Sequence, residues 1–322
     1  DAPQVDPNAV AGSAGAAATS ELSASEAAPA VEAPRIVIDA PLVSGSISLA
    51  GLRVDDIMLK AYQETQDPDS ENIQFLLKTS TVAPFFAEFG WASADAAQPM
   101  PKSDSVWTAS SMVLSPGSPV TLTWENGNGL TFRRQLSIND DYMITVDDSV
   151  ESALSAPLTL FPYGLVRRHG TPATTGIYIL HEGALGVFDE TLREEDYDDM
   201  RDADGGVSEI RPEMPGGWIG FTDKYWLAAL LPDQSANMNF AFKSLAGPSD
   251  RYQVDYIASE ASVLPAGGVV SSQTRLFAGA KKVSLLDGYA DELGIANFDL
   301  AIDFGWFYFL TLSLIHITEP TR

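Results

Sequence analysis

The residues of this chain best suited to acid–base chemistry are its three histidines, because imidazole titrates closest to neutral pH. His169 follows two arginines, and His181 stands directly before Glu182. An imidazole and a carboxylate that converge on a sugar could act as the acid and the base of an epimerase. His169, His181 and Glu182 are therefore the candidates for a sugar site. Neighbours in sequence need not converge in space, so histidines in loops or at strand ends are the simpler interpretation.

An acidic run from Asp189 to Asp204 is the second candidate, because it holds nine carboxylates. Calcium prefers about six to eight oxygen ligands. The spacing does not fit an EF-hand, however. If Gly205 took the turn position, the first ligand would be Met200 and the bidentate ligand would be Arg211. We therefore expect a solvated acidic loop that does not bind calcium tightly.

The sequence contains no other motif for catalysis. A nucleophile elbow of the G-x-S-x-G type is absent, and so are the glycine patterns that bind nucleotide phosphates. The chain has no cysteine, which excludes disulfides and cysteine-bound metals. We expect no catalytic residue, no metal site and no cofactor, and hence a protein that is not an enzyme.

The charge of the chain excludes one class of partner. Lysine and arginine number 19 against 44 aspartates and glutamates, a formal net charge of −25. Nucleic-acid binding requires clustered lysine and arginine, so no nucleic-acid partner is expected. The same balance argues against broad docking on anionic lipid headgroups.

Short β-strands must position the candidate side chains, because polar and apolar residues alternate in many short runs from Arg35 onward. The clearest case is a hairpin over Thr121–Phe132, with Glu125–Gly129 as its turn. Many short strands with few helical stretches predict an all-β fold, a sandwich or a barrel. Further strands are expected at Ser46–Leu49, Tyr142–Asp147, Ile177–Leu180, Trp218–Phe221, Tyr225–Leu231 and Asn239–Phe242.

One helix is expected near the end of the β-rich region. Val283, Leu286, Tyr289 and Leu293 have helical spacing. Gly294 stands where a helix commonly ends in a left-handed residue. The sequence therefore predicts a short helix that ends at about this glycine.

An aromatic run follows this helix and suits a membrane interface. Its members are Phe304, Trp306, Phe307, Tyr308, Phe309 and Leu310. The apolar stretch that continues to Ile317 is about 14 residues long, shorter than the ~20 residues needed to span a bilayer. Tryptophan and tyrosine favour the headgroup region, so we expect an interfacial segment. The alternative is that these aromatics pack onto the β-domain as ordinary core.

The organisation of the chain follows from its composition. Residues 1–34 are rich in Ala, Ser, Pro and Glu and contain no aromatic residue, which predicts a disordered tether; an Ala-rich helix is the alternative. Residues 35–300 are expected to form one β-sandwich, and 301–311 to begin a membrane segment. The chain lacks an initial Met and a signal-like region, so we expect a fragment of a longer protein.

Four segments form a recognisable pattern by their order along the chain. They are Ser44–Leu49 with the following Asp55-Asp56, Ala87–Trp91, Gly217–Leu227 and Phe298–Phe309. Together they resemble the periplasmic domain of the YidC family of bacterial membrane protein insertases, and its α-proteobacterial members most. The resemblance covers roughly residues 35–311. In the family, a segment similar to Asp303–Trp306 leads from the periplasmic domain toward the membrane.

The resemblance implies a β-supersandwich related to galactose mutarotases. It implies that insertase activity belongs to a transmembrane bundle after this domain, and that another transmembrane helix precedes it, so that the chain is truncated before the bundle. It places the parent protein in the bacterial inner membrane, with this portion facing the periplasm. The implied partners are components of the Sec translocon and nascent inner-membrane proteins.

The end of the chain departs from the family. Residues 312–322 resemble translated sequencing-adapter read-through and are expected to be non-native, so His316 carries no meaning. Two other functions remain open. One is a carbohydrate-binding or degenerate aldose-epimerase-like domain of the cell envelope, and the other is an envelope interaction module unrelated to insertion.

The aromatic run predicts a membrane contact that can be measured. Flotation with lipid vesicles should recover more of the full chain than of a version that ends at Asp303, because Phe304–Leu310 supplies the interfacial side chains. Equal flotation of the two proteins would show that this segment is not the membrane contact.

Overall fold

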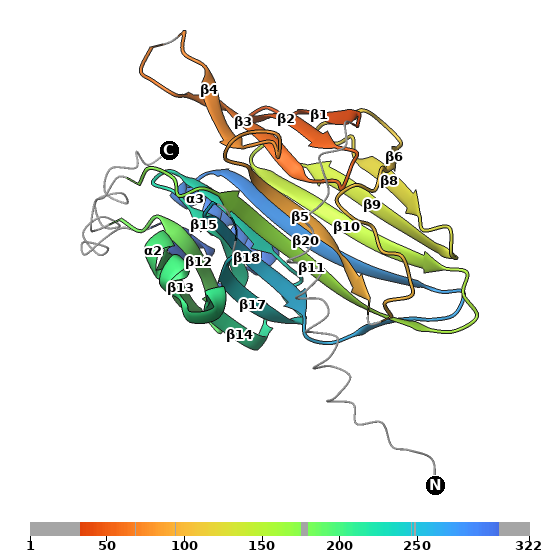
Figure 1. Cartoon of the computed structure of the whole chain (residues 1–322). Helices are drawn as coiled ribbons and strands as arrows, with labels where there is room; N and C mark the ends of the chain where they lie inside the picture. Colours follow the sequence, from red (N-terminus) through yellow and green to blue (C-terminus); the bar gives the residue numbers. More distant parts are fainter. Residues whose placement is uncertain are drawn as a thin grey trace.

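The computed structural model describes residues 33–67, 69–93, 95–174, 180–245, 247 and 249–302, which form two large β-sheets. The expected all-β supersandwich is therefore confirmed (Figure 1). The larger sheet has the order β14 (Val207–Pro215), β17 (Asn237–Ser244), β18 (Arg251–Ala258), β11 (Leu158–His169), β5 (Phe85–Ser93), β3 (Val54–Gln63), β2 (Val43–Ser48), β1 (Arg35–Asp39) and β7 (Val113–Leu114), with β19 (Ser262–Leu264) on β11 and β4 (Asn72–Leu76) on β3. The smaller sheet has the order β13 (Thr191–Asp196), β12 (Gly183–Phe188), β15 (Trp218–Thr222), β16 (Trp226–Leu231), β20 (Val269–Ala280), β10 (Met143–Ser152), β9 (Leu130–Ile138), β8 (Val120–Glu125) and β6 (Thr108–Ala109).

Some of the sequence predictions fall on residues outside these described ranges. They are nearly all of the tether over 1–34, the strand over Ile177–Leu180 except its last residue, the aromatic run Phe304–Leu310, and the read-through segment 312–322. These remain predictions.

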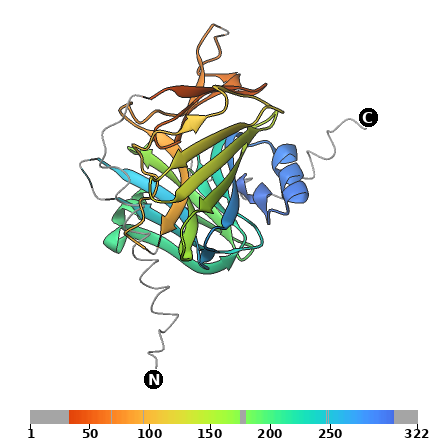
Figure 2. The same ribbon diagram turned by 90° about the vertical axis from the view of Figure 1, so that its right-hand side faces the viewer.

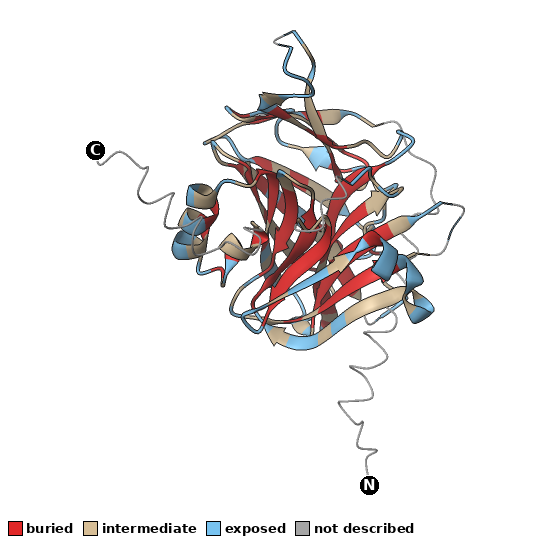
Figure 3. Ribbon diagram, turned by 90° about the vertical axis from the view of Figure 1, so that its left-hand side faces the viewer, coloured by how far each residue is buried: buried red, intermediate tan, exposed pale blue. Residues whose placement is uncertain are grey.

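The facing sides of the two sheets form the main hydrophobic core. Alternation along each strand explains its composition: in β9, Leu130, Phe132, Leu136 and Ile138 are buried on the core side together with Arg134, while the residues that alternate with them are not buried. Figure 3 shows the buried residues concentrated along the central strands, with exposed residues on hairpin tips and short helices. The core thus lies between the sheets and extends along their length.

The local predictions for the described strands and the C-terminal helix are confirmed. β8 and β9 form the expected hairpin, in which the Leu130 N–H donates to the side-chain oxygen of Asn126 in the turn. Helix α3 spans Val283–Leu293 and ends at Gly294, whose φ of 64° is left-handed. Its buried Leu286 and Tyr289 hold it against the side of the strands (Figure 2).

The acidic run is not the predicted loop, although its carboxylates are solvated as predicted, since none of the nine is buried. The run forms edge strand β13 and then helix α2 (Tyr197–Asp202), followed by a 3₁₀ turn over Asp204–Gly206. Asp196 caps the helix, because its carboxylate accepts hydrogen bonds from the next backbone N–H groups at Asp198 and Asp199. Tyr197 and Met200, three residues apart, turn into the core. The cap supplied by Asp196 and the burial of Tyr197 and Met200 together account for the helix in this run.

A buried arginine joins the two sheets. Arg134 on β9 makes a bidentate ion pair with its cross-strand neighbour Asp148 on β10, at 2.7 and 2.8 Å. Its Nη2 also donates to the carbonyl oxygen of Phe89 on β5, in the opposite sheet, at 2.9 Å. Burial opposes the charged form, and the Asp148 carboxylate outweighs it, so the pKa of Arg134 is raised.

This contact predicts a large loss of stability on truncation. Arg134→Ala leaves Asp148 in the interior without its counter-charge, and should lower the free energy of unfolding by about 3–5 kcal/mol in urea titrations. Arg133→Ala is the matched control, because Arg133 pairs with Glu151 on the exposed side of the same two strands and should change stability far less. Equal effects of the two substitutions would contradict this assignment.

Candidate ligand-binding cleft

The outer face of the larger sheet carries a ladder of charged and polar side chains. Alternation places Glu88, Arg167, Gln253, Asp255 and Lys243 on the side of their strands opposite the main core. Arg167 Nε donates to Gln253 Oε1 at 2.9 Å, and Gln253 Nε2 donates to Asp255 at 2.6 Å. Lys243 Nζ completes the row: it lies 2.8 Å from Asp255 Oδ2, the oxygen that also accepts from Gln253, and 2.9 Å from Asp255 Oδ1. All five side chains are buried.

The ladder is paired internally, which fits a structural role. Glu88 accepts a hydrogen bond from Arg53 Nε at 2.8 Å. Burial lowers the pKa of Arg167, and the nearby Glu88 carboxylate opposes that shift. A buried polar network of this kind stabilises a sheet only when its members satisfy one another. Cross-strand pairing therefore occupies the groups that a catalytic site would need free.

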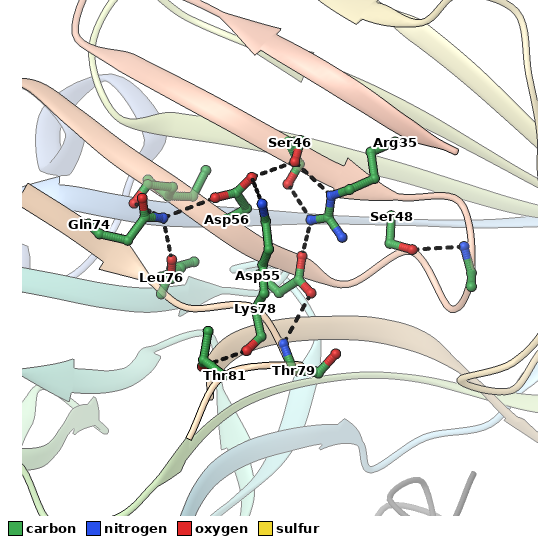
Figure 4. A network of polar contacts seen from close by, with 12 residues as sticks. Arg35, Ser46, Ser48, Asp55, Asp56, Gln74, Leu76, Lys78, Thr79 and Thr81 are labelled. Carbon is green, nitrogen blue, oxygen red and sulfur yellow. Dashed lines mark hydrogen bonds and ion pairs between the residues drawn. The ribbon is translucent and has the colours of Figure 1, made fainter. Parts of the chain in front are cut away.

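A second polar network fixes the strands at the other end of the larger sheet (Figure 4). Arg35 on β1 pairs with Asp55 on β3. Asp56 accepts from Gln74 Nε2 on β4 at 3.0 Å and from Lys78 Nζ at 3.2 Å. These bonds attach β4 and the loop after it to the sheet, although β4 pairs only with β3 and projects beyond the sandwich (Figure 1).

An open cleft of about 380 Å³ lies between this attached strand and the end of β11. It is lined by Ile73, Gln74, Phe75, Leu77, Ala83, Phe85, Arg168, His169, Gly170, Thr171, Pro172, Asp223 and Trp226. Its volume is within the ~300–1,000 Å³ of small-molecule and peptide-anchor sites. Apolar walls with a few polar groups make it the best candidate binding site among the described residues.

Arg168 and Asp223 are the charged groups of the cleft. Arg168 Nη1 donates to Asp223 at 2.6 Å and to the Tyr197 hydroxyl at 3.1 Å, and its guanidinium carbon lies 4.6 Å from the centre of the Phe85 ring. Burial opposes the charge of Arg168, but Tyr197 and Asp223 together raise its pKa. Burial also raises the pKa of Tyr197, so its phenol stays protonated. Arg168 therefore remains a cation, hydrogen-bonded to Asp223.

Of the three residues predicted for a sugar site, one lines the cleft. His169 lines the cleft. The His181 Nε2 atom lies 2.9 Å from the Ala184 carbonyl oxygen, and the Glu182 carboxylate accepts from the Lys224 backbone N–H at 3.2 Å. Neither His181 nor Glu182 lines the cleft. The sugar site itself remains a prediction.

Sequence reasoning did not single out the two charged residues of the cleft. Arg168 was visible only as part of an arginine pair beside His169, and nothing in the sequence showed that Asp223, from a distant turn, would meet it. Across the described ranges, no group of three or more His, Asp or Glu side chains could hold a metal ion.

The family model of the YidC periplasmic domain matches residues 35–317. The chain belongs to this family. Membrane protein insertase YidC of Methylobacterium sp. (strain 4-46) is 46% identical over 312 residues, which cover 95% of this chain and 49% of the relative. Membrane protein insertase YidC of Beijerinckia indica is 45% identical over 286 residues, which cover 88% of this chain and 47% of the relative. The chain thus spans about half the length of the curated relatives it matches.

Two solved structures are similar to this member of the YidC periplasmic domain family. A galactose mutarotase-like protein from Lactobacillus casei has a TM-score of 0.48 and 13% identity, covering 76% of this chain and 99% of the other. A putative aldose 1-epimerase from Escherichia coli K12 has a TM-score of 0.45 and 8% identity, covering 77% and 99%. None of the helices in the described ranges is long and apolar enough to cross a membrane.

His169 predicts a pH dependence of stability in this family member. Burial first, and then Arg167 and Arg53, lower its pKa from the ordinary 6.5. The unfolded histidine takes up its proton at a higher pH than the folded one, so stability should fall as pH decreases through about 6.5. His169→Gln removes this titrating group, so urea titrations between pH 7.5 and 5.5 should show a smaller loss of stability for the variant. Equal losses would contradict the assignment.

Proposed function

We propose that this chain is the non-catalytic periplasmic part of an inner-membrane protein insertase. It would support the insertion and folding of inner-membrane proteins, with or without the Sec translocon. The observation that carries the proposal is the family match over residues 35–317, together with relatives of twice the length that are named membrane protein insertase. The partners are then nascent inner-membrane proteins and Sec components.

The proposed organisation follows the sequence prediction. Residues 1–34 would be a tether from a preceding membrane helix, 35–300 the periplasmic sandwich, and 301–311 the start of a membrane segment. A tether of this composition keeps a folded domain near a membrane without ordering it. The parent protein would lie in the bacterial inner membrane, with this portion in the periplasm.

The geometry of the polar groups supports a role without catalysis. The cleft contains His169, whose lowered pKa favours the neutral imidazole, but neither of the other two candidates for acid–base work. The carboxylate in the cleft, Asp223, is ion-paired with Arg168 at 2.6 Å. A general base must be within reach of a substrate proton, and this carboxylate already accepts a hydrogen bond from Arg168.

Insertion requires more than this domain, for a physical reason. A sandwich satisfies its backbone polar groups within its own sheets and presents charge to water, and unsatisfied polar groups or charges cost several kcal/mol each in lipid. The full chain has a net charge of −25, which opposes its entry into a bilayer. Transfer of a helix from water to lipid would be the work of membrane-spanning segments in the parent protein.

A chimera tests the proposal. Residues 35–302 of this chain would replace the matched region of the Methylobacterium sp. insertase, in cells depleted of their own insertase. We expect the chimera to restore insertion of a reporter membrane protein, while the isolated chain inserts nothing into lipid vesicles.

The control is the same insertase with an unrelated soluble β-sandwich of similar size in that position. A chimera no better than this control would overturn the proposed role of the domain. Insertion of the reporter by the isolated chain would overturn the division of labour between domain and membrane segments.

A further inference from the structure

We propose that residues 21–32 cross the outer face of the larger sheet and cover its charged ladder. The docking surface lies on β5, β11, β18 and β17, on the side of these strands opposite the main core. We call residues 21–32 the N-terminal strap. The tether predicted over 1–34 then has a free part, residues 1–20, and a part that is docked on the domain.

The ladder is buried too completely for a sheet face that is open to water. Arg167 and Gln253 are 0% exposed, and Asp255 is 2% exposed. The outer face of an antiparallel sheet commonly faces solvent, so burial of this degree requires other parts of the chain over it. These fractions were obtained for a single chain. The cover therefore belongs to this chain and not to a partner.

Two small apolar clusters on the same face need the same cover. Phe86 and Leu165 form one of them, and Ala92, Phe161 and Ile257 form the other. All five side chains are buried, yet neither cluster is part of the main core. Small clusters separate from the core of a domain typically lie under long irregular segments. A long segment over this face accounts for both the buried charges and the buried apolar groups.

The described helices and strands do not supply this cover. β11 packs mainly against its sheet neighbours β5, β18 and β19 and, across the core, against β16. Neither α2 nor α3 packs extensively on β5, β11 or β18. Residues 303–322 follow α3, whose Tyr289 contacts Phe277 in the smaller sheet. The segment before residue 33, in contrast, joins the larger sheet directly at β1.

The register of the larger sheet leads from the start of β1 to the ladder. One cross-strand row contains Ile36, Ile47, Val54, Ala87, Val166 and Val254. Arg167 and Gln253 stand next to this row and opposite each other. Three strands separate β1 from β11, which places them roughly 19 Å apart. An extended stretch of the strap's length reaches about 40 Å, so the strap can cross the ladder at right angles to the strands.

The charges of the ladder fit an acidic strap. The ladder and its neighbour Arg53 hold three cations and two carboxylates, which leaves one positive charge in excess: Arg53, Arg167 and Lys243 against Glu88 and Asp255. The strap contains Glu21, Glu26 and Glu32 and neither lysine nor arginine. A buried charge without a counter-charge is costly, so a strap carboxylate stabilises this face.

Thiol labelling tests the proposal, because the chain has no cysteine of its own. Ala241→Cys places one thiol on the outer face of β17, where Ala241 stands opposite Asp255 and is 8% exposed. We expect N-ethylmaleimide to label it at least about tenfold faster in a chain that begins at Ala33 than in the full chain, because removal of the strap uncovers the thiol. A chain that begins at Glu21 should be labelled as slowly as the full chain.

The control thiol is Ser118→Cys, in an exposed turn. It should be labelled at the same rate in all three chains. Circular dichroism would show that each chain is folded. Equal labelling of Ala241→Cys in the full chain and in the folded chain that begins at Ala33 would overturn the proposal.

A second pair of variants keeps the full length of the chain, and decides the matter if the chain that begins at Ala33 does not fold. Glu26→Lys with Glu32→Lys should speed the labelling of Ala241→Cys at least about threefold, because lysines in the strap repel the excess positive charge of the ladder. Asp1→Lys with Asp6→Lys makes the same change of charge outside the strap and should leave the rate unchanged. Equal effects of the two pairs would also overturn the proposal.

Discussion

The ion pair between Arg134 and Asp148, and its bond to the Phe89 carbonyl, is the contact on which the arrangement of the two sheets depends. A guanidinium buried between sheets has to find its partners at fixed positions, because an unpaired charge there is far more costly than a lost apolar contact. Apolar contacts are non-directional, whereas these hydrogen bonds have defined partners and so fix β9, β10 and β5 relative to each other. The position of the Phe85 end of β5, and hence one wall of the cleft, follows from it.

The features predictable from sequence are those with a local cause. The hairpin over Thr121–Phe132 is encoded by two alternating runs and the turn between them, and helix α3 by apolar spacing and Gly294. The composition of the acidic run predicted a loop. The run instead contains a helix, because Tyr197 and Met200 stand at the helical spacing that buries them. The parallel pairing of β1 with β7 has no local signature, because the paired residues, such as Val37 and Val113, are far apart in sequence.

The candidate site was only partly predictable for the same reason. His169 could be selected by residue type, and it does line the cleft. The sequence could not assign the two preceding arginines to faces of the strand. Alternation places Arg167 in the buried ladder and Arg168 on the opposite side of β11. A shift of one residue in register would exchange these two arginines between a structural and a ligand-facing position. Sequence shows that two arginines are adjacent, while the sheet decides what each contacts.

The topology also sets the order in which the domain can fold. β10 is hydrogen-bonded on one side by its near neighbour β9, but on the other side by β20, with Met143 opposite Phe277. If the chain enters a compartment from its N-terminal end, β10 remains an open strand edge until nearly all of the domain has followed. Pairings between such distant strands form slowly, and open edges are templates for aggregation. The interval between emergence and closure of the smaller sheet is therefore the period in which a nascent copy of this domain is most exposed to mispairing.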